Sequence, residues 1–273
     1  MEALLDTIRG FRAVSGRQLA VAQSEAEPFA AFDPGQLRVE VAAGASARLV
    51  VVHAAAGVSS LEIVLGQGAR LALCELFLAE AFAEVRVRQQ AGSAFGLTVV
   101  QTASANGAWT VDLEGRDAAC EADCVFLAAD DEHCSVRLRT NHRVADCRSR
   151  SLVKGVAGGR AVGEFHGLVY VARDAQRTDA RQQSRNIVLG DGARIVAEPQ
   201  LEIYADDVKC SHGATVGQMD DQAILYMRQR GLSEAQARRL QIEGFVGDVV
   251  ARCDIEPLRE VLTALVTAKL EKL

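Results

Sequence analysis

Apolar and polar residues alternate with a period of two along much of the chain from Leu37 onward. This alternation predicts β-strands with one buried face, and it is clearest in residues 37–41, 61–65 and 109–113. Turns that contain glycine follow at nearly constant intervals of 24, 24 and 23 residues, at Gly44, Gly68, Gly92 and Gly115. Such regular spacing indicates a stacked repeat in which each coil contributes strands joined at a glycine corner.

The expected fold is therefore mainly β, with a parallel β-helix (solenoid) core over residues 37–216. Small side chains let neighbouring coils approach to ~4.8 Å, which agrees with an aromatic content of only 5%. A sandwich of hairpins is the competing fold, because Asp191-Gly192 is a strong hairpin-turn signal between two apolar runs.

After Gly217 the period becomes helical. Asp220 can cap a helix that runs through Arg230, and Ser233 with Gln236 forms a capping box for a second helix. Pro257 fits the first turn of a last helix. That helix carries one apolar stripe, made of Leu258, Val261, Leu262, Leu265 and Val266. We expect a C-terminal helical subdomain over residues 217–273, with this stripe facing the solenoid or a partner.

Residues 1–36 contain one short amphipathic helical pattern, unlike a signal peptide, followed by a weakly patterned linker. No apolar run approaches the ~18 residues that cross a bilayer, so a cytoplasmic protein without membrane contact is expected. The seven cysteines lack a CxxC pair and sit mostly among apolar residues, as reduced buried thiols do. A net charge of -6, from 30 basic and 36 acidic residues, argues against binding to nucleic acid.

Cys210 and His212 lie in the last stretch of strand character before the helices, residues 204–217. Residues two apart on a strand share a face, so these two side chains point to the same side, with Cα atoms ~7 Å apart. Thiolate and imidazole are ligands that iron and zinc accept. Two ligands form only half of a metal site, and a second chain would have to supply the rest. The alternative interpretation is a buried cysteine beside a hydrogen-bonded histidine.

Other chemistry-bearing residues give weaker signals. Cys120 and Cys124 would lie ~13 Å apart on one strand, too far to share a metal ion. His53, His142 and His166 have no nucleophile at a diagnostic spacing. The nucleotide motifs GxxxxGK[ST] and GxGxxG are absent, so intrinsic ATPase activity is not expected.

Several segments together resemble one protein family. They are Phe165–Val171, Gln183–Asn186, Leu189–Ala193, Pro199–Gly217 and Met219–Gly231. These segments closely resemble the SufB/SufD family of iron–sulfur cluster assembly scaffold proteins, and the SufD branch fits best. The specific likeness covers roughly residues 160–250, and a diffuse β-repeat likeness begins at about residue 37.

The resemblance implies a right-handed parallel β-helix with a C-terminal helical subdomain. It also implies a SufBCD-like complex in which a SufB-like chain pairs with a SufD-like chain and each docks a SufC-type ABC ATPase. Cys210 and His212 match family positions that face the SufB partner and take part in forming a nascent iron–sulfur cluster. The helices match the ATPase-binding part, which places four residues near that contact: Tyr226, Met227, Phe245 and Val249. The family's N-terminal helical region is almost absent from this sequence, and a role for flavin is left open.

The expected function is a non-catalytic scaffold subunit that pairs with a SufB-like chain or, when alone, with itself. Two alternatives remain open from the sequence. One is a structural β-helix homodimer without metal chemistry. The other is a β-helix acyltransferase with His53, His142 or His166 as its base, although the repeat has no clear sixfold subdivision.

Overall fold

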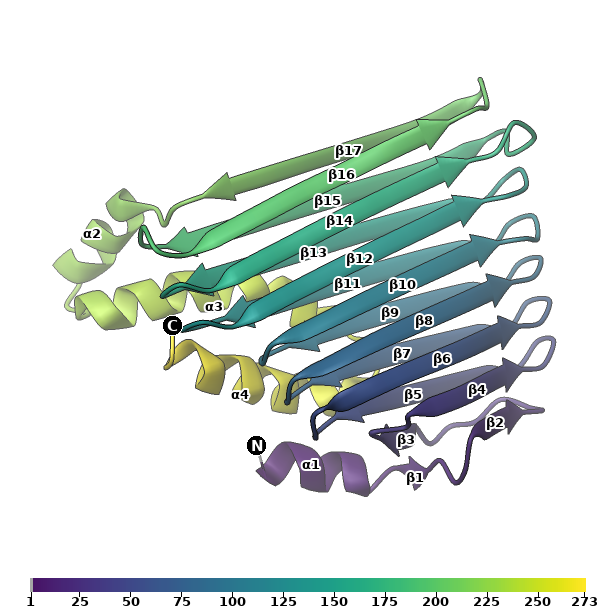
Figure 1. Ribbon diagram of the computed structural model, residues 1–273, viewed down its shortest axis with the longest axis horizontal. Helices are drawn as coiled ribbons and strands as arrows, with labels where there is room; N and C mark the ends of the chain where they lie inside the picture. The colour runs from purple at the N-terminus through teal and green to yellow at the C-terminus, as the bar shows by residue number, and fades with distance from the viewer. Residues whose placement is uncertain (1) are drawn as a thin grey trace.

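The chain winds into a solenoid with two walls, which a computed structural model describes for residues 2–273, with side chains from Leu5 onward. Every strand pair in this part of the chain is parallel, as a β-helix requires. The coils stack in sequence order, and the helices α3 and α4 lie along one wall (Figure 1). The predicted parallel β-helix is confirmed.

Odd-numbered strands build one wall and even-numbered strands build the other. The first wall contains β1 (Arg12–Ala13), β3 (Phe29–Phe32), β5 (Ser46–His53), β7 (Arg70–Phe77), β9 (Ala94–Gln101), β11 (Ala119–Ala128), β13 (Arg148–Gly158), β15 (Thr178–Leu189) and β17 (Val208–Gly217). The second contains β2 (Gln18–Val21), β4 (Gln36–Val41), β6 (Gly57–Leu65), β8 (Ala81–Gln89), β10 (Ala105–Leu113), β12 (His133–His142), β14 (Val162–Val171) and β16 (Arg194–Ile203). Each strand pairs with strands two positions away in the sequence, so one coil comprises one strand of each wall.

The competing hairpin sandwich is wrong. β15 and β16 belong to different walls, and Asp191-Gly192 lies in the corner between them rather than in a hairpin turn. Gly190 takes φ = 86° at this corner, a conformation that glycine adopts at little cost. A corner and a hairpin require the same turn chemistry, so the local signal could not distinguish them.

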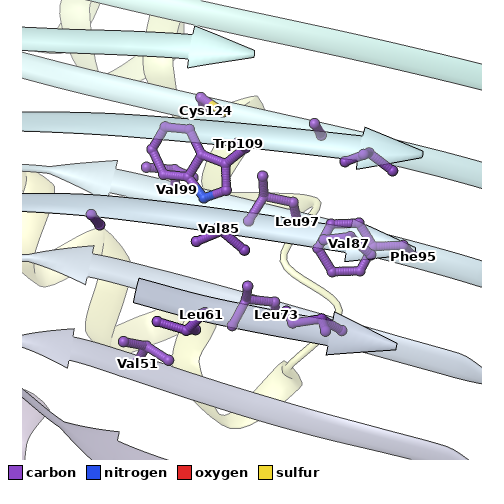
Figure 2. Close-up of a cluster of buried hydrophobic side chains, with 14 of the residues drawn as sticks. Val51, Leu61, Leu73, Val85, Val87, Phe95, Leu97, Val99, Trp109 and Cys124 are labelled. Carbon is purple, nitrogen blue, oxygen red and sulfur yellow. The ribbon is translucent and has the colours of Figure 1, made fainter. Parts of the chain in front are cut away.

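The repeat places equivalent side chains above one another inside the solenoid. Leu37, Leu61, Val85 and Trp109 follow in register on successive coils of the second wall. Their neighbours fill the interior with aliphatic side chains and a few aromatic ones (Figure 2). Trp109 is 1% exposed, and Gly107 makes room for its ring, because a Cβ atom there would meet the ring at 1.9 Å.

α2 and α3 begin where the sequence predicts, whereas Pro257 lies in a 3₁₀ turn just before the last helix rather than in its first turn. Asp220 accepts hydrogen bonds from the backbone of α2 (Asp221–Gln229), and Ser233 and Gln236 form the capping box of α3 (Glu234–Ala251). A short 3₁₀ turn (Glu256–Leu258) precedes α4 (Arg259–Leu270), and α1 spans Glu2–Arg9. These end signals are local, since each cap depends on residues within about one turn.

The apolar stripe of the last helix faces the solenoid. Leu258 and Leu262 are fully buried, Leu265 and Val266 are 5% and 3% exposed, and Val261 is half-buried. They pack with residues of α3 and of the first wall in one apolar cluster. Two buried lysines add polar ties: Lys269 Nζ bonds both carboxylate oxygens of Glu132 at 2.6 Å, and Lys154 Nζ bonds Asp248 Oδ1 at 2.7 Å. One face of α3 and α4 is therefore anchored to the strands.

The solenoid begins earlier than the sequence pattern indicates. The strands β1, β2 and β3 lie within the segment expected to be a linker, and they pair with the next strands of each wall. They have only two to four residues each, too few for a recognisable alternation. No helix of the described residues is long and apolar enough to span a membrane.

Candidate functional site

The last coil of the solenoid is open. β16 and β17 are the final strands of their walls, and each pairs with a neighbour on one side only within the described chain. Figure 1 shows them at the top of the stack with no further coil above them. An uncovered strand edge presents backbone N–H and C=O groups that a strand of another chain can pair with.

Cys210 and His212 lie on β17, on the side that faces inward in the coils below. Cys210 is in register with Ala180 and His212 with Gln182, and both partners are buried in the interior. Register neighbours in a parallel sheet point to the same side, so the thiol and the imidazole continue the interior row of side chains. The structure thus brings the two predicted residues to one face, where no coil covers them.

Cys210 is half-buried in a small apolar cluster that contains Val169, Val171 and Ala180. Burial raises the pKa of the Cys210 thiol, and nearby Asp179 raises it further, while a backbone hydrogen bond from Ala180 opposes the shift. The thiol is therefore protonated at neutral pH, and a metal ion would have to displace its proton to bind.

His212 is exposed, and its register neighbour Gln182 has an Nε2 atom that is buried without a hydrogen-bond partner. Within residues 2–273, no group of three His, Cys, Asp or Glu side chains is arranged to hold a metal ion. Cys210 and His212 thus supply two ligands at most, and a complete site needs further ligands from outside the described chain.

Exposed apolar side chains also lie on the last coil. Ile203 is 38% exposed, Val216 is 49% exposed and Tyr204 is 57% exposed. Ile203 and Val216 are in register with the buried residues Val171 and Asn186 of the coil below, so a further coil would cover them. Tyr204 instead lies beside Tyr170, with ring centroids 5.7 Å apart. The combination of an apolar rim with a strand edge is suited to contact with another protein surface.

The four residues that the resemblance places near an ATPase do not form one surface. Tyr226 is 57% exposed on α2 and Met227 is half-buried there. Phe245 is half-buried, with its ring 4.7 Å from Lys154 Nζ, and Val249 is fully buried between α3 and the first wall. Val249 therefore cannot contact a partner in this structure. Its side of α3 packs on the first wall and on α4.

The remaining candidates are mostly structural. Cys120 and Cys124 are buried inside the solenoid, where burial raises the pKa of Cys120 to about 12. His142 is fully buried, and burial lowers its pKa to about 4. His166 is more exposed than His142, and its Nδ1 atom lies 3.0 Å from Glu198 Oε2. Neither buried cysteine is placed to act on a solute.

A buried polar cluster in the core was not predicted. Glu75 has no exposed surface, accepts a 2.8 Å hydrogen bond from Trp109 Nε1 and lies 2.8 Å from His53 Nε2. The His53 ring stacks on Phe77 with centroids 4.4 Å apart. Glu75 shares the interior side of β7 with Leu73 and Phe77, and its partners come from other coils, so no local signal pairs it with them.

Comparison with protein families gives a match over most of the chain. Residues 23–245 match the model described as "SUF system FeS cluster assembly, SufBD core domain". The chain belongs to the SufBD family. The match includes the open end with Cys210 and His212 as well as helix α2 and most of α3.

Relatives named SufD support the SufD branch. The chain is 34% identical to the iron–sulfur cluster assembly protein SufD of Escherichia coli (strain K12), over 161 residues that cover 59% of this chain and 38% of that protein. It is 34% identical to SufD of Bacillus subtilis (strain 168), over 44% of this chain and 28% of the relative. A SufBD family protein of Mycobacterium tuberculosis is 37% identical over 54% of this chain and 39% of its own length. The chain thus spans less than two fifths of the length of these relatives.

Proposed function

We propose that this protein is a non-catalytic scaffold subunit for iron–sulfur cluster assembly, with the nascent cluster as its cargo. The observation that carries the proposal is the open final coil, on which Cys210 and His212 share one uncovered face. The names of the related SufD proteins and of the family domain agree with a role in cluster assembly.

The partner at this face is a SufB-like chain, or a second copy of this protein when it is alone. Both walls end here in strands that are unpaired on one side, so a second solenoid end could extend both sheets. The apolar side chains of Ile203, Tyr204 and Val216 would lose their exposure in such a contact.

Chemically, the site is incomplete without that partner. A thiol and an imidazole are suitable ligands for iron, and the partner chain would provide the others. Because the pKa of Cys210 is raised, iron binding would release a proton and bind more weakly in acid. A role for flavin has no support in the described residues.

The second partner is a SufC-type ABC ATPase that docks on the C-terminal helices. We propose α2 as the contact, because Leu225 and Tyr226 are 55% and 57% exposed and Met227 lies beside them. α2 lies next to the last coils of the solenoid and projects beyond the ends of their strands (Figure 1). By contrast, α3 and α4 are anchored to the first wall. All seven cysteines are free thiols, which agrees with a protein that acts in the reducing cytoplasm.

The test is anaerobic cluster assembly by the full protein together with its SufB-like and ATPase partners. Cys210→Ser and His212→Ala should each lower the cluster-derived visible absorbance at least about tenfold, because each removes one ligand. Ser211→Ala is the matched control, since Ser211 lies between them on the opposite face of β17. Normal cluster assembly by both variants would show that the site assignment is wrong.

Melting temperature separates this function from the structural alternative. His212 is exposed and Cys210 is only half-buried, so both variants should melt within a few degrees of the wild type. Large losses of stability with unchanged cluster assembly would instead support a structural homodimer. An acyltransferase is disfavoured by the burial of His53 and His142, which are 3% and 0% exposed.

A further inference from the structure

The outer face of the first wall carries two neighbouring arginines near the start of β13 and β15. Arg150 on β13 is in register with Arg181 on β15, and both side chains are exposed. Leu152, on the same side of β13 as Arg150, packs in the cluster with α3 and α4, so this side is the outer one. Register neighbours on adjacent strands lie ~4.8 Å apart and point to the same side, so the two guanidinium groups are immediate neighbours.

These two arginines lack strong carboxylate partners. Within residues 5–273, Arg150 forms no ion pair, even with Glu121, its register neighbour on β11. Arg181 has one ion pair, in which its Nε atom lies 3.4 Å from Asp179 Oδ1, and its side chain is 58% exposed. An exposed ion pair of this kind contributes little to stability. The positive charge of the pair is therefore available to an anion from solution.

Further positive charge lies beside the pair. Arg148 and Lys209 are the register neighbours of Asp179 on its two sides, and neither forms an ion pair in the described part of the chain. With the two central arginines, these cations outnumber the carboxylates next to them, Glu121 and Asp179. Like charges on neighbouring strands repel each other, and an anion bound between them would remove that repulsion.

Two cavities flank the arginine pair along the strands. The first has a volume of about 370 Å³ and is lined by Arg148, Ser149 and Asp179 as well as by both arginines of the pair. The second has a volume of about 170 Å³ and is lined by both arginines and by Arg252, the residue that ends α3. Both volumes exceed that of a phosphate group. Two linked anionic groups could thus occupy one cavity each and contact the same two guanidinium groups.

We propose that Arg150 and Arg181 bind the diphosphate group of a small ligand, with one phosphoryl group in each cavity. A guanidinium group is a planar fork that donates paired hydrogen bonds to the oxygens of a phosphoryl group. The inference does not depend on the function of the open end, because neither Cys210 nor His212 lines either cavity.

The carboxylates on this face favour a compact anion over an extended acidic polypeptide. Glu121 and Asp179 both line the larger cavity. A run of acidic side chains laid across the face would pass close to both carboxylates, and the like charges would repel. A diphosphate group is short enough to contact the arginines without covering this part of the cavity rim.

The site is tested by isothermal titration calorimetry of the full chain with pyrophosphate and, separately, with inorganic phosphate. We expect pyrophosphate to bind at low ionic strength and inorganic phosphate to bind at least about tenfold more weakly, because it fills one cavity only. Added salt should weaken both, since the site is exposed to solvent. Absence of pyrophosphate binding at millimolar concentrations would overturn the proposal.

Two variants identify the arginines that carry the binding. Arg150→Gln and Arg181→Gln should each weaken pyrophosphate binding at least about tenfold, and both should fold, because each side chain is exposed. Arg160→Gln is the matched control, since it removes the same charge from an exposed arginine that already bonds Asp131 at 2.7 Å, in the corner between β13 and β14. Equal weakening by the control would show attraction by net charge alone, and the proposal would be wrong.

Asp179→Asn provides a change in the opposite direction. It removes the carboxylate that pairs with Arg181 and lines the larger cavity, so pyrophosphate should bind several-fold more tightly. Weaker binding by this variant would contradict the assigned arrangement of charges.

A third set of titrations distinguishes the sources of the diphosphate group. Tighter binding of ADP than of pyrophosphate would assign the site to a nucleotide, and tighter binding of pyrophosphate would assign it to free inorganic diphosphate. A glutamate-rich peptide that binds more tightly than either, and that Arg150→Gln no longer binds, would show that the face receives an acidic protein segment. That result would overturn the proposal.

Discussion

At the scale of single residues, the solenoid tolerates buried polar side chains where they have hydrogen-bond partners. Glu75 has no exposed surface, but Trp109 and His53 both contact its carboxylate at 2.8 Å. An unpaired carboxylate in this interior would cost several kcal/mol, so the three side chains are interdependent. His142 has one partner, Ser149 Oγ at 2.9 Å, and its other ring nitrogen has none.

The burial of His142 makes stability depend on pH. Its pKa is lowered to about 4 in the folded protein, below the value of ~6.5 in an unfolded chain, so acid protonates the unfolded state first. Stability from this residue is complete above about pH 6.5 and is lost as the pH falls toward 4. When the pH is lowered from 7 to 5, the free energy of unfolding should fall by about 2 kcal/mol less in His142→Gln than in the wild type. Urea unfolding at the two pH values measures this difference.

His166→Gln is the control for this measurement. His166 is 37% exposed at its side chain and pairs with Glu198 on the outer face of the solenoid. The control tests whether the removal of a histidine outside the core has the same effect as the removal of the buried one. A wild-type pH slope in His142→Gln would show that the buried imidazole is not its source.

At the scale of elements, one face of α4 decides how the helices sit on the strands. Leu262 is fully buried in the cluster between α4, α3 and the first wall. The predicted stripe thus faces the solenoid rather than a partner, and it leaves only the outer faces of α2, α3 and α4 for docking.

Leu262→Ala should destabilise the folded protein by about 2–5 kcal/mol, because it removes buried methyl groups and leaves a cavity. The loss is measured by urea unfolding, together with faster amide hydrogen exchange in α4. Leu240→Ala makes the same chemical change at a residue on α3 that is 50% exposed, and it should cost less than about 1 kcal/mol. Equal effects of the two substitutions would mean that α4 does not depend on this contact.

At the scale of the whole molecule, the two ends of the stack differ. The N-terminal coils are short, and α1 lies beneath them with Ile8 fully buried (Figure 1). At the C-terminal end, β16 and β17 leave apolar side chains exposed. α1 packs with α4 and the 3₁₀ turn, whereas no helix of the described chain covers the last coil, and we propose association through that open end.

Val216→Asp should weaken association at this end, because a carboxylate would be buried there without a partner. A penalty of about 2 kcal/mol corresponds to roughly 30-fold weaker binding, measured by sedimentation over a concentration series of the chain alone and with its partner. Val58→Asp is the control, since Val58 is 72% exposed on β6, away from the last coil. Association of Val216→Asp with wild-type affinity would exclude the open end as the interface.

Local patterns predicted the elements of the fold well. Alternation around Leu61 and Trp109 predicted strands, the spacing of the glycine turns predicted stacked coils, and Ser233 with Gln236 predicted the start of α3. These signals depend on neighbours in the sequence. The pattern failed where strands were short, as in β1 to β3, and at the Asp191-Gly192 corner, where one turn chemistry serves two folds.

By itself the sequence determined the repeat, the helix ends and the shared face of Cys210 and His212, because each follows from the geometry of a few consecutive residues. Only the tertiary structure decided that this face lies uncovered on the last coil, that Val249 is buried, and that Glu75 contacts Trp109 and His53. Those facts depend on how distant segments pack, and the stacking of coils and helices brings together residues whose separation along the chain carries no local signal.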